Sequence, residues 1–118
     1  MNLDLTTIRF PAPAIASILH RISGVVLFLA LPILLWLLHR SLASGSDFAA
    51  VGELLQMPLM KLIVWGILAA VIYHLAAGVR HMLMDMGVGE SLQGGRRGAY
   101  MVFAVSALLI VLTGIWIW

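Results

Sequence analysis

The fold is decided by one apolar stretch, LIVWGILAAVIYHLAAGV, which occupies residues 62–79. It contains no charged side chain, and its length is close to the roughly 20 residues that a helix needs to cross the hydrocarbon core of a bilayer. Two further runs without a charge occupy residues 22–38 and 98–118. The pattern predicts an all-α integral membrane protein with three transmembrane helices.

The composition agrees with a membrane protein. Of the 118 residues, 63% are hydrophobic and 10% are charged, whereas a soluble domain carries about a quarter charged residues. A chain of this length with three spans forms one membrane domain, residues 1–118, with no room for a soluble one. The net charge of +2 comes from side chains at the ends of the spans. It gives no indication of nucleic-acid binding, and the expected surroundings are a lipid bilayer.

The chain contains no cysteine. This excludes disulfides, thiolate metal sites, iron–sulfur ligation and covalent attachment of haem. Any haem bound here must therefore be b-type and held without covalent links. We expect no cleaved signal peptide, because the first apolar run is long and starts well into the chain.

Proline and glycine mark the boundaries of the expected spans. Pro32 should kink the first span, and Pro58 suits the opening turn of the second. The first connection, residues 40–57, is polar and could contain a short surface helix from Asp47 to Leu55. The second connection, residues 85–95, is rich in glycine. We expect a surface segment over residues 1–13 and transmembrane helices at about residues 14–39, 58–84 and 98–118.

The basic residues predict the orientation in the membrane. Three spans place the N-terminus and the second connection on one side, and most of the arginines belong to that side. Loops rich in arginine and lysine stay in the cytoplasm, so we expect a cytoplasmic N-terminus and a C-terminus outside. The first group is Arg9, Arg21, Arg80, Arg96 and Arg97, and the second is Arg40 and Lys61.

Two histidines mark one face of the second span. His74 and His81 are two helical turns apart, about 10 Å along the axis, with Gly78 between them on nearly the same face. The glycine leaves a notch in which a flat group could lie. An imidazole in an apolar helix is costly without a partner. We interpret this face as one wall of a haem pocket, with His74 as an axial ligand; the alternative is a histidine that is hydrogen-bonded to a neighbouring helix.

The second axial ligand is not expected from this chain. Axial ligands approach opposite faces of the iron, which two residues on one helix face cannot do. His39 belongs to the other side of the membrane, and His20 is expected to lie too near the surface to face His74. A partner chain is the better source. His81 and Arg80 could neutralise haem propionates, or could simply favour the helix end through its dipole.

A third group, Ser17, His20 and Arg21, has the i, i+3, i+4 spacing of one helix face. A hydroxyl and a guanidinium one turn apart can both reach a carbonyl or an anion, so the group could serve a quinone oxygen, a haem propionate, or both. The alternative is an arginine that extends to lipid phosphates while Ser17 bonds to its own helix. Four other residues are interpreted as structural, through aromatic packing or close helix approach: Trp36, Trp65, Gly66 and Gly114.

Two stretches resemble the signatures of a known family. Residues 17–24, SILHRISG, resemble the pattern S-x-x-H-R-x-[ST]-G, and residues 74–81, HLAAGVRH, resemble H-x-x-x-G-x-R-H. Both patterns belong to the cytochrome b membrane anchor of succinate dehydrogenase (complex II), one of the two small anchors of that enzyme. The opening NLDL and IRFP segments, residues 2–5 and 8–11, are similar to the enterobacterial members. The match covers nearly the whole chain.

The resemblance implies a function and a set of roles. The three helices would form half of a two-subunit haem-binding anchor in the bacterial cytoplasmic membrane. His74 would bind the iron of haem b opposite a histidine of the sister anchor. Ser17 and Arg21 would line the ubiquinone site, and His20 and Arg21 would lie near the haem propionates. An iron–sulfur subunit and a flavoprotein would complete the enzyme, since the chain alone catalyses nothing. Two alternatives remain: a non-redox membrane scaffold, and a haem-less anchor of the fumarate reductase type.

Overall fold

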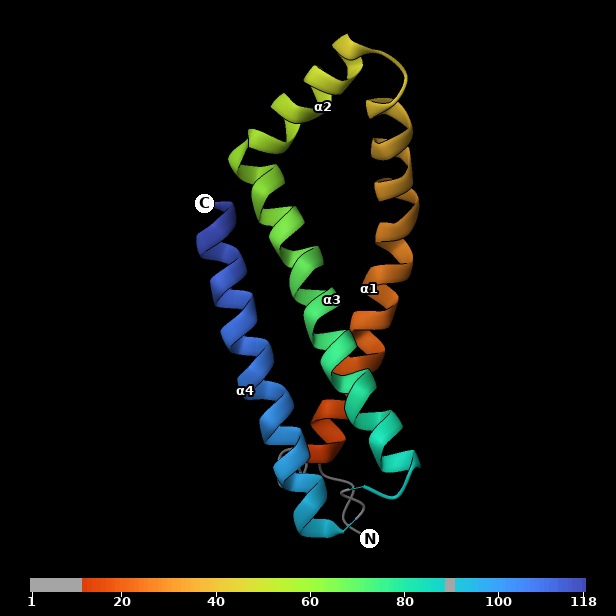
Figure 1. Ribbon diagram of the computed structural model, residues 1–118, viewed down its shortest axis with the longest axis vertical. Coiled ribbons are helices and arrows are strands. Elements are labelled where there is room, and N and C mark those ends of the chain that lie inside the picture. The colour runs from red at the N-terminus through yellow and green to blue at the C-terminus, as the bar shows by residue number, and fades with distance from the viewer. Residues whose placement is uncertain (1–11, 89–90) are drawn as a thin grey trace, which may run out of the picture.

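The computed structural model describes residues 12–88 and 91–118. Within these ranges helices are the only regular secondary structure (Figure 1), and three of the helices are long and apolar enough to cross a membrane. The expectation of an all-α protein with three spans is therefore confirmed. The helices are α1 (Ala12–Ser41), α2 (Gly45–Gln56), α3 (Pro58–Asp85) and α4 (Leu92–Ile117).

The largest difference from the expected boundaries is at the start of α4. This helix begins at Leu92, inside the region expected as the second connection. The hydroxyl of Ser91 accepts a hydrogen bond from the backbone N–H of Gly94 at 2.9 Å. Such a cap satisfies one of the donors that a helix start leaves open, which offsets the low helix propensity of the glycines. At the other end of the chain, α1 includes residues 12 and 13 of the expected surface segment. The rest of that segment lies outside the described residues.

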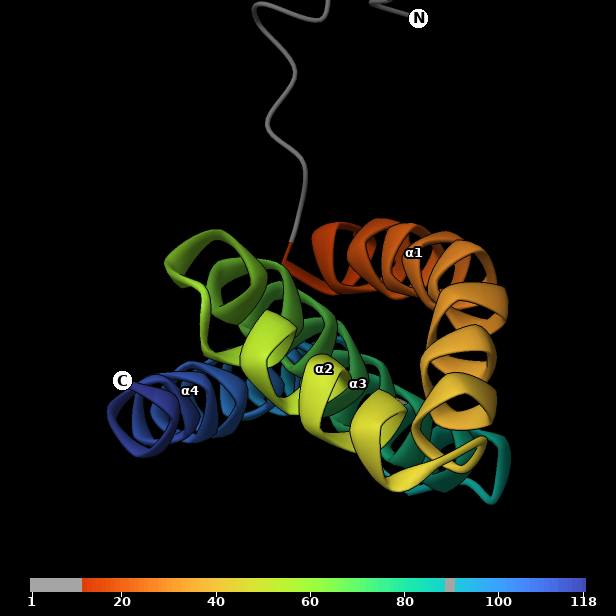
Figure 2. The same ribbon diagram turned by 90° about the horizontal axis from the view of Figure 1, so that it is seen from above.

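The first connection contains the helix that was considered possible there. Helix α2 extends over Gly45–Gln56, a little longer than expected, and the hydroxyl of Ser44 accepts the backbone N–H of Asp47 at 3.0 Å. Pro58 stands in the first turn of α3, where its missing N–H is tolerated. Pro32 lies inside α1 without ending it, and the axis of that helix curves in Figure 2.

Helix α3 contacts both α1 and α4. In Figure 1, α1 and α3 approach each other near the start of α1, and they separate toward α2. The end of α3 and the start of α4 lie at the same end of the molecule as the start of α1, and α2 lies at the opposite end. The first half of α1 and the last half of α3 are therefore the parts that can build a shared site.

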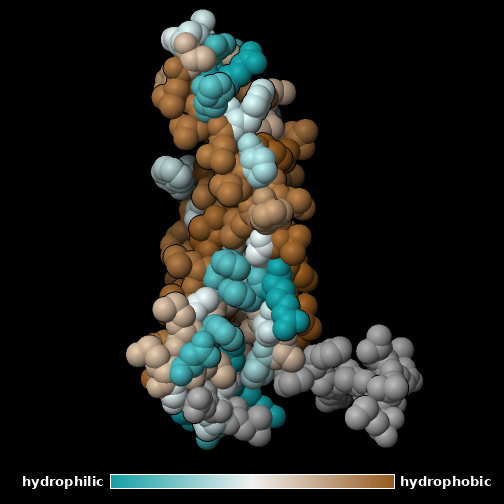
Figure 3. All heavy atoms as spheres, turned by 90° about the vertical axis from the view of Figure 1, so that its right-hand side faces the viewer, coloured by the Kyte–Doolittle hydropathy of each residue, from teal (hydrophilic) through white to brown (hydrophobic). Residues whose placement is uncertain are grey.

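Small residues dominate the few buried positions. Among the described residues no large side chain is fully buried. Small side chains let helix backbones approach closely, which is how helices associate in a membrane. The large apolar side chains face outward and form the broad hydrophobic surface in Figure 3. The buried hydrophobic residues are Ala16, Ala30, Ala77, Ala99 and Val102.

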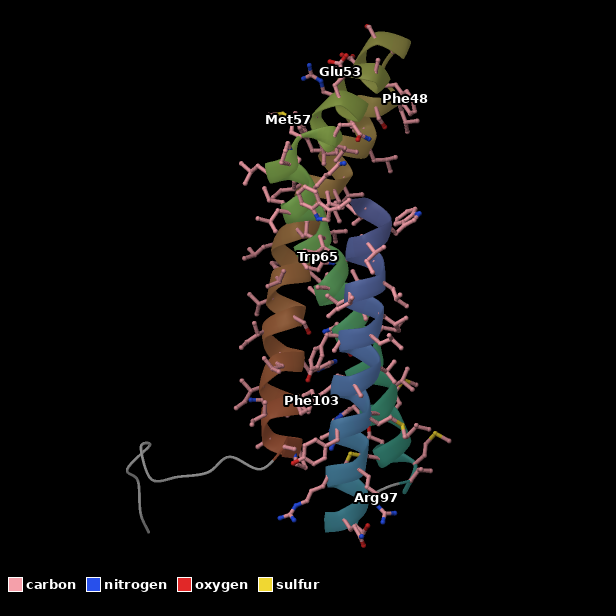
Figure 4. All side chains as sticks on the ribbon, turned by 90° about the vertical axis from the view of Figure 1, so that its left-hand side faces the viewer. Phe48, Glu53, Met57, Trp65, Arg97 and Phe103 are labelled. Atoms are coloured by element: carbon pink, nitrogen blue, oxygen red, sulfur yellow. The ribbon has the colours of Figure 1, made fainter. Side chains whose placement is uncertain are left out.

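A tryptophan fixes the contact between α3 and α4 (Figure 4). The indole N–H of Trp65 donates a hydrogen bond to the Ile110 carbonyl at 2.8 Å. A Cβ atom built on Gly114 would lie only 2.9 Å from the indole ring, so the close approach expected at Gly114 is confirmed. The same expectation for Gly66 is wrong within this chain, because a Cβ atom there meets nothing within 4 Å.

Candidate functional site

His74 is held by hydrogen bonds from α3 to α1. Its Nδ1 lies 2.9 Å from the Ser23 hydroxyl and 3.2 Å from the His20 carbonyl oxygen. The Ser23 hydroxyl donates its own hydrogen to the same carbonyl at 2.7 Å. A carbonyl oxygen can only accept, so the arrangement requires a hydrogen on Nδ1 of His74. The other ring nitrogen, Nε2, is then the one with a lone pair to offer a metal.

The ring of His20 is stacked on the ring of His74. Their centroids are 4.2 Å apart and their planes differ by 8°. His20 therefore lies at the same depth as His74, and the expectation that it sits too near the surface to face His74 is wrong. Two rings at this distance are in direct contact, with no space for a flat macrocycle between them. In this arrangement the two histidines cannot bind opposite faces of one iron.

Two glycines make room for these rings. A Cβ atom on Gly24 would lie 3.2 Å from Cε1 of His74, and a Cβ atom on Gly78 would lie 3.7 Å from Nε2 of His20. The first distance is tighter than an ordinary contact and the second is not. The notch expected at Gly78 therefore lies against the edge of the His20 ring, while Gly24 of α1 gives His74 its space.

Sequence reasoning missed two of the contacts that build the site. Ser23, only 6% exposed, was not assigned a role. The hydroxyl of Tyr73, next to His74, donates to the Ala16 carbonyl at 2.7 Å and ties α3 to α1 a second time. The spacing of Ala16, His20 and Ser23 is i, i+4, i+7, which places all three on one helix face. This shared face is the sequence feature that could have pointed to Ser23 and to the Ala16 carbonyl.

Ser17 and Arg21 occupy a different part of the α1 surface. Both are exposed, one helical turn apart. They are therefore accessible to a ligand or a partner chain rather than used in packing within this one. Figure 3 shows, on the face that it presents, hydrophilic side chains in the lower half of the molecule, below a broad hydrophobic band.

The structure does not bring His81 and Arg80 to His74. His81 is exposed, and its Nε2 lies 3.6 Å from a carboxylate oxygen of Asp85. Arg80 faces α4, where its Nη2 donates to the Gly95 carbonyl at 3.2 Å. Its Nε lies close to Gly98, since a Cβ atom there would be 3.2 Å away. Arg80 also borders an apolar cavity of about 430 Å³ between α3 and α4, away from the His74 contacts with α1.

Comparison with known proteins identifies the family. The family model described as "Succinate dehydrogenase/Fumarate reductase transmembrane subunit" matches residues 1–113. The chain belongs to this family. As a succinate dehydrogenase/fumarate reductase transmembrane subunit it is a multi-pass membrane anchor, and the resemblance found in the sequence is confirmed.

Relatives within the family carry a common name. The chain is 52% identical over 119 aligned residues to the "Succinate dehydrogenase cytochrome b556 subunit" of Coxiella burnetii, with 100% of this chain and 95% of the relative covered. The protein of the same name from Paracoccus denitrificans is 33% identical, with 96% and 87% covered. That of Rickettsia felis is also 33% identical, with 81% and 74% covered.

Proposed function

We propose that this chain is the cytochrome b membrane-anchor subunit of a succinate:quinone oxidoreductase, which holds haem b together with a sister anchor and forms part of a ubiquinone-reduction site. The names of the relatives support this proposal. The observation that carries it is the hydrogen bonding of His74, whose Nδ1 is held by Ser23 and the His20 carbonyl.

The donor set fits a haem. A histidine that binds a metal almost always donates its other ring N–H to a carbonyl, a carboxylate or water, which fixes its tautomer and orientation. His74 meets this requirement through α1. The absence of cysteine from the sequence leaves imidazole as the natural ligand. Since His20 is stacked on His74, a histidine of the sister anchor would complete the haem site, with His74 as the ligand from this chain. When bound, the haem supplies one-electron transfer.

Ser17 and Arg21 are the proposed quinone residues. The Ser17 hydroxyl would donate a hydrogen bond to a carbonyl oxygen of ubiquinone, and the Arg21 guanidinium would stabilise the negative charge that develops there on reduction. Both side chains are exposed and one turn apart, as a shared ligand requires. His20 and His81 are proposed near the haem propionates. The support is weaker for His81, which has Asp85 as its neighbour.

The other members of the complex complete the electron path. We assign the oxidation of succinate to a flavoprotein and the transfer of its electrons to an iron–sulfur subunit, which docks where the quinone site lies. The distribution of arginines favours a cytoplasmic N-terminus and a periplasmic C-terminus in a bacterial cytoplasmic membrane. The chain itself catalyses no reaction alone.

The test is a reduced-minus-oxidised absorption spectrum of the purified membrane complex. We expect a b-type band in the wild type and its loss or shift in His74→Ala, with the complex still assembled. His39→Ala is the matched control, because His39 is at the opposite end of α1, and it should leave the band unchanged. A wild-type complex without a band would overturn the haem assignment.

The same spectrum separates the proposal from its two rivals, and an assay of quinone reduction separates the rivals from each other. A non-redox scaffold predicts no band and no effect of His74→Ala on anything except assembly. A haem-less anchor of the fumarate reductase type predicts no band but retains quinone reactivity. The relatives named here are succinate dehydrogenase subunits, which favours the first proposal over both.

A further inference from the structure

Ser23 is a buried polar residue with two hydrogen bonds, one within its own helix and one to Nδ1 of His74. It is 6% exposed. Its hydroxyl lies between two groups of the site, the His20 carbonyl at 2.7 Å and Nδ1 of His74 at 2.9 Å. A serine inside a helix often bonds back to its own carbonyl three or four residues earlier. That habit explains the first contact but not the second, which crosses between helices.

The two contacts assign the hydrogens in one consistent way. The carbonyl of His20 can only accept, so it takes the hydroxyl hydrogen of Ser23. The lone pairs of the serine oxygen are then directed to accept the N–H of His74. Because the His20 carbonyl is also 3.2 Å from the same nitrogen, both neighbours of Nδ1 are acceptors. Each of them favours the tautomer that leaves the lone pair on Nε2.

We propose that Ser23 is the positioning residue of the haem ligand: it fixes the tautomer and ring orientation of His74 and increases its electron donation to the iron. This inference rests on the proposed function of His74. A metal-binding imidazole becomes more basic when the N–H of its other ring nitrogen donates to an acceptor. A more basic ligand stabilises the oxidised metal, so Ser23 lowers the midpoint potential of the haem.

The test compares three variants at this position in the intact complex. Ser23→Ala removes the nearer of the two acceptors of the His74 N–H, at 2.9 Å, and leaves the His20 carbonyl at 3.2 Å. The loss should shift the midpoint potential of the haem to a more positive value. It should also weaken haem retention by about 10- to 100-fold, the usual effect of losing such a partner. Ser23→Thr keeps the hydroxyl and should restore both properties. Ser23→Cys has a weaker acceptor of similar size, so its midpoint potential and haem retention should lie between those of the wild type and the alanine variant. If the alanine variant does not assemble, the cysteine variant provides the test.

Ser106 offers a matched control. It is also a buried serine, 2% exposed, but it belongs to α4, and its hydroxyl has no hydrogen-bond partner in the part of the chain that the structure describes. Ser106→Ala should leave the potential and haem retention unchanged. An equal shift in Ser23→Ala and Ser106→Ala would show a general packing effect and overturn the proposal, as would a Ser23→Ala complex with wild-type potential and retention.

The outcomes also separate this proposal from the one on which it rests. If the wild-type complex has a b-type band that His74→Ala removes, the haem assignment stands whatever Ser23 does. A wild-type potential and retention in the serine variants would then reject only the role of Ser23. If the wild type has no band, the haem assignment itself fails.

Discussion

The two faces of α3 make contacts of opposite kinds. Toward α1, the contact is polar and incompletely covered, with His74 bonded to Ser23 and the His20 carbonyl. Toward α4, the contact is packed around Trp65, whose indole lies against Gly114 and donates to the Ile110 carbonyl; the apolar cavity bordered by Arg80 is lined by other residues of the two helices. One helix thus presents a reactive group on one side and a packed contact on the other.

The difference indicates how the chain separates function from stability. If a second chain supplies a ligand to the site, as proposed above, the side chains of this chain cannot cover the site completely. The packing that holds α3 in place therefore has to come from the other side. Substitutions toward α1 should change the redox properties and spare stability, whereas substitutions toward α4 should do the reverse.

The largest effect is expected from Arg21→Leu on the α1 side. Loss of the guanidinium would remove the charge proposed to stabilise reduced quinone, and removal of one such donor lowers turnover by about 10²-fold or more. Succinate oxidation with an artificial acceptor should survive, because it does not use this site. Arg97 is another exposed arginine, so Arg97→Leu is the control and should leave the rate of quinone reduction unchanged. A wild-type rate of quinone reduction in Arg21→Leu would reject the site assignment.

The next largest effect is expected at Gly114 on the α4 side. An alanine there would place a methyl group 2.9 Å from the Trp65 ring, and such overpacking costs about 1–3 kcal/mol. Thermal unfolding of the purified complex should occur at lower temperature while the haem band keeps its position. Gly66→Ala, which meets nothing within 4 Å, should not destabilise. A displaced haem band in Gly114→Ala would show that the two faces are coupled.

Gly24→Ala tests the α1 side with a smaller change. The added methyl group would lie 3.2 Å from the His74 ring, so the ring must shift by a few tenths of an ångström. We expect a shifted haem band or potential, with a stability change of no more than about 1 kcal/mol. Gly78→Ala, where the nearest atom is 3.7 Å away, should have neither effect. If Gly24→Ala and the wild type had identical haem spectra and potentials, the His74 ring would not be held tightly against α1.

The smallest effect is expected from Trp65→Phe. This change keeps an aromatic ring and removes the hydrogen bond to Ile110. Interhelical hydrogen bonds in membrane proteins contribute about 0.6 kcal/mol on average. Denaturant or thermal titration of the complex should show a loss of this order, with an unchanged haem potential. A much larger loss would mean that the indole N–H dominates the α3–α4 contact.

The sequence was sufficient for the spans but not for the contacts between them. Long apolar runs determine that residues such as His74 lie inside a transmembrane helix, because every backbone polar group must be satisfied there. The rotation of each helix about its axis depends on packing against its neighbours. Spacing places His20 and Ser23 on one face of α1. It does not say that this face meets His74, so the contacts of His74 with Ser23 and His20 could not be predicted from one helix alone. The early start of α4 was missed because its cap, Ser91, precedes glycines that normally indicate a loop.

The partial cover of His74 has a consequence for biogenesis. His74 is only partly covered within this chain, and polar groups at membrane depth are costly. If the proposed sister anchor covers this histidine, assembly would remove that cost, and the unassembled chain would be the less stable species in the bilayer. The abundance of the two anchors should be coupled through turnover of the unpaired one, without any need for matched synthesis.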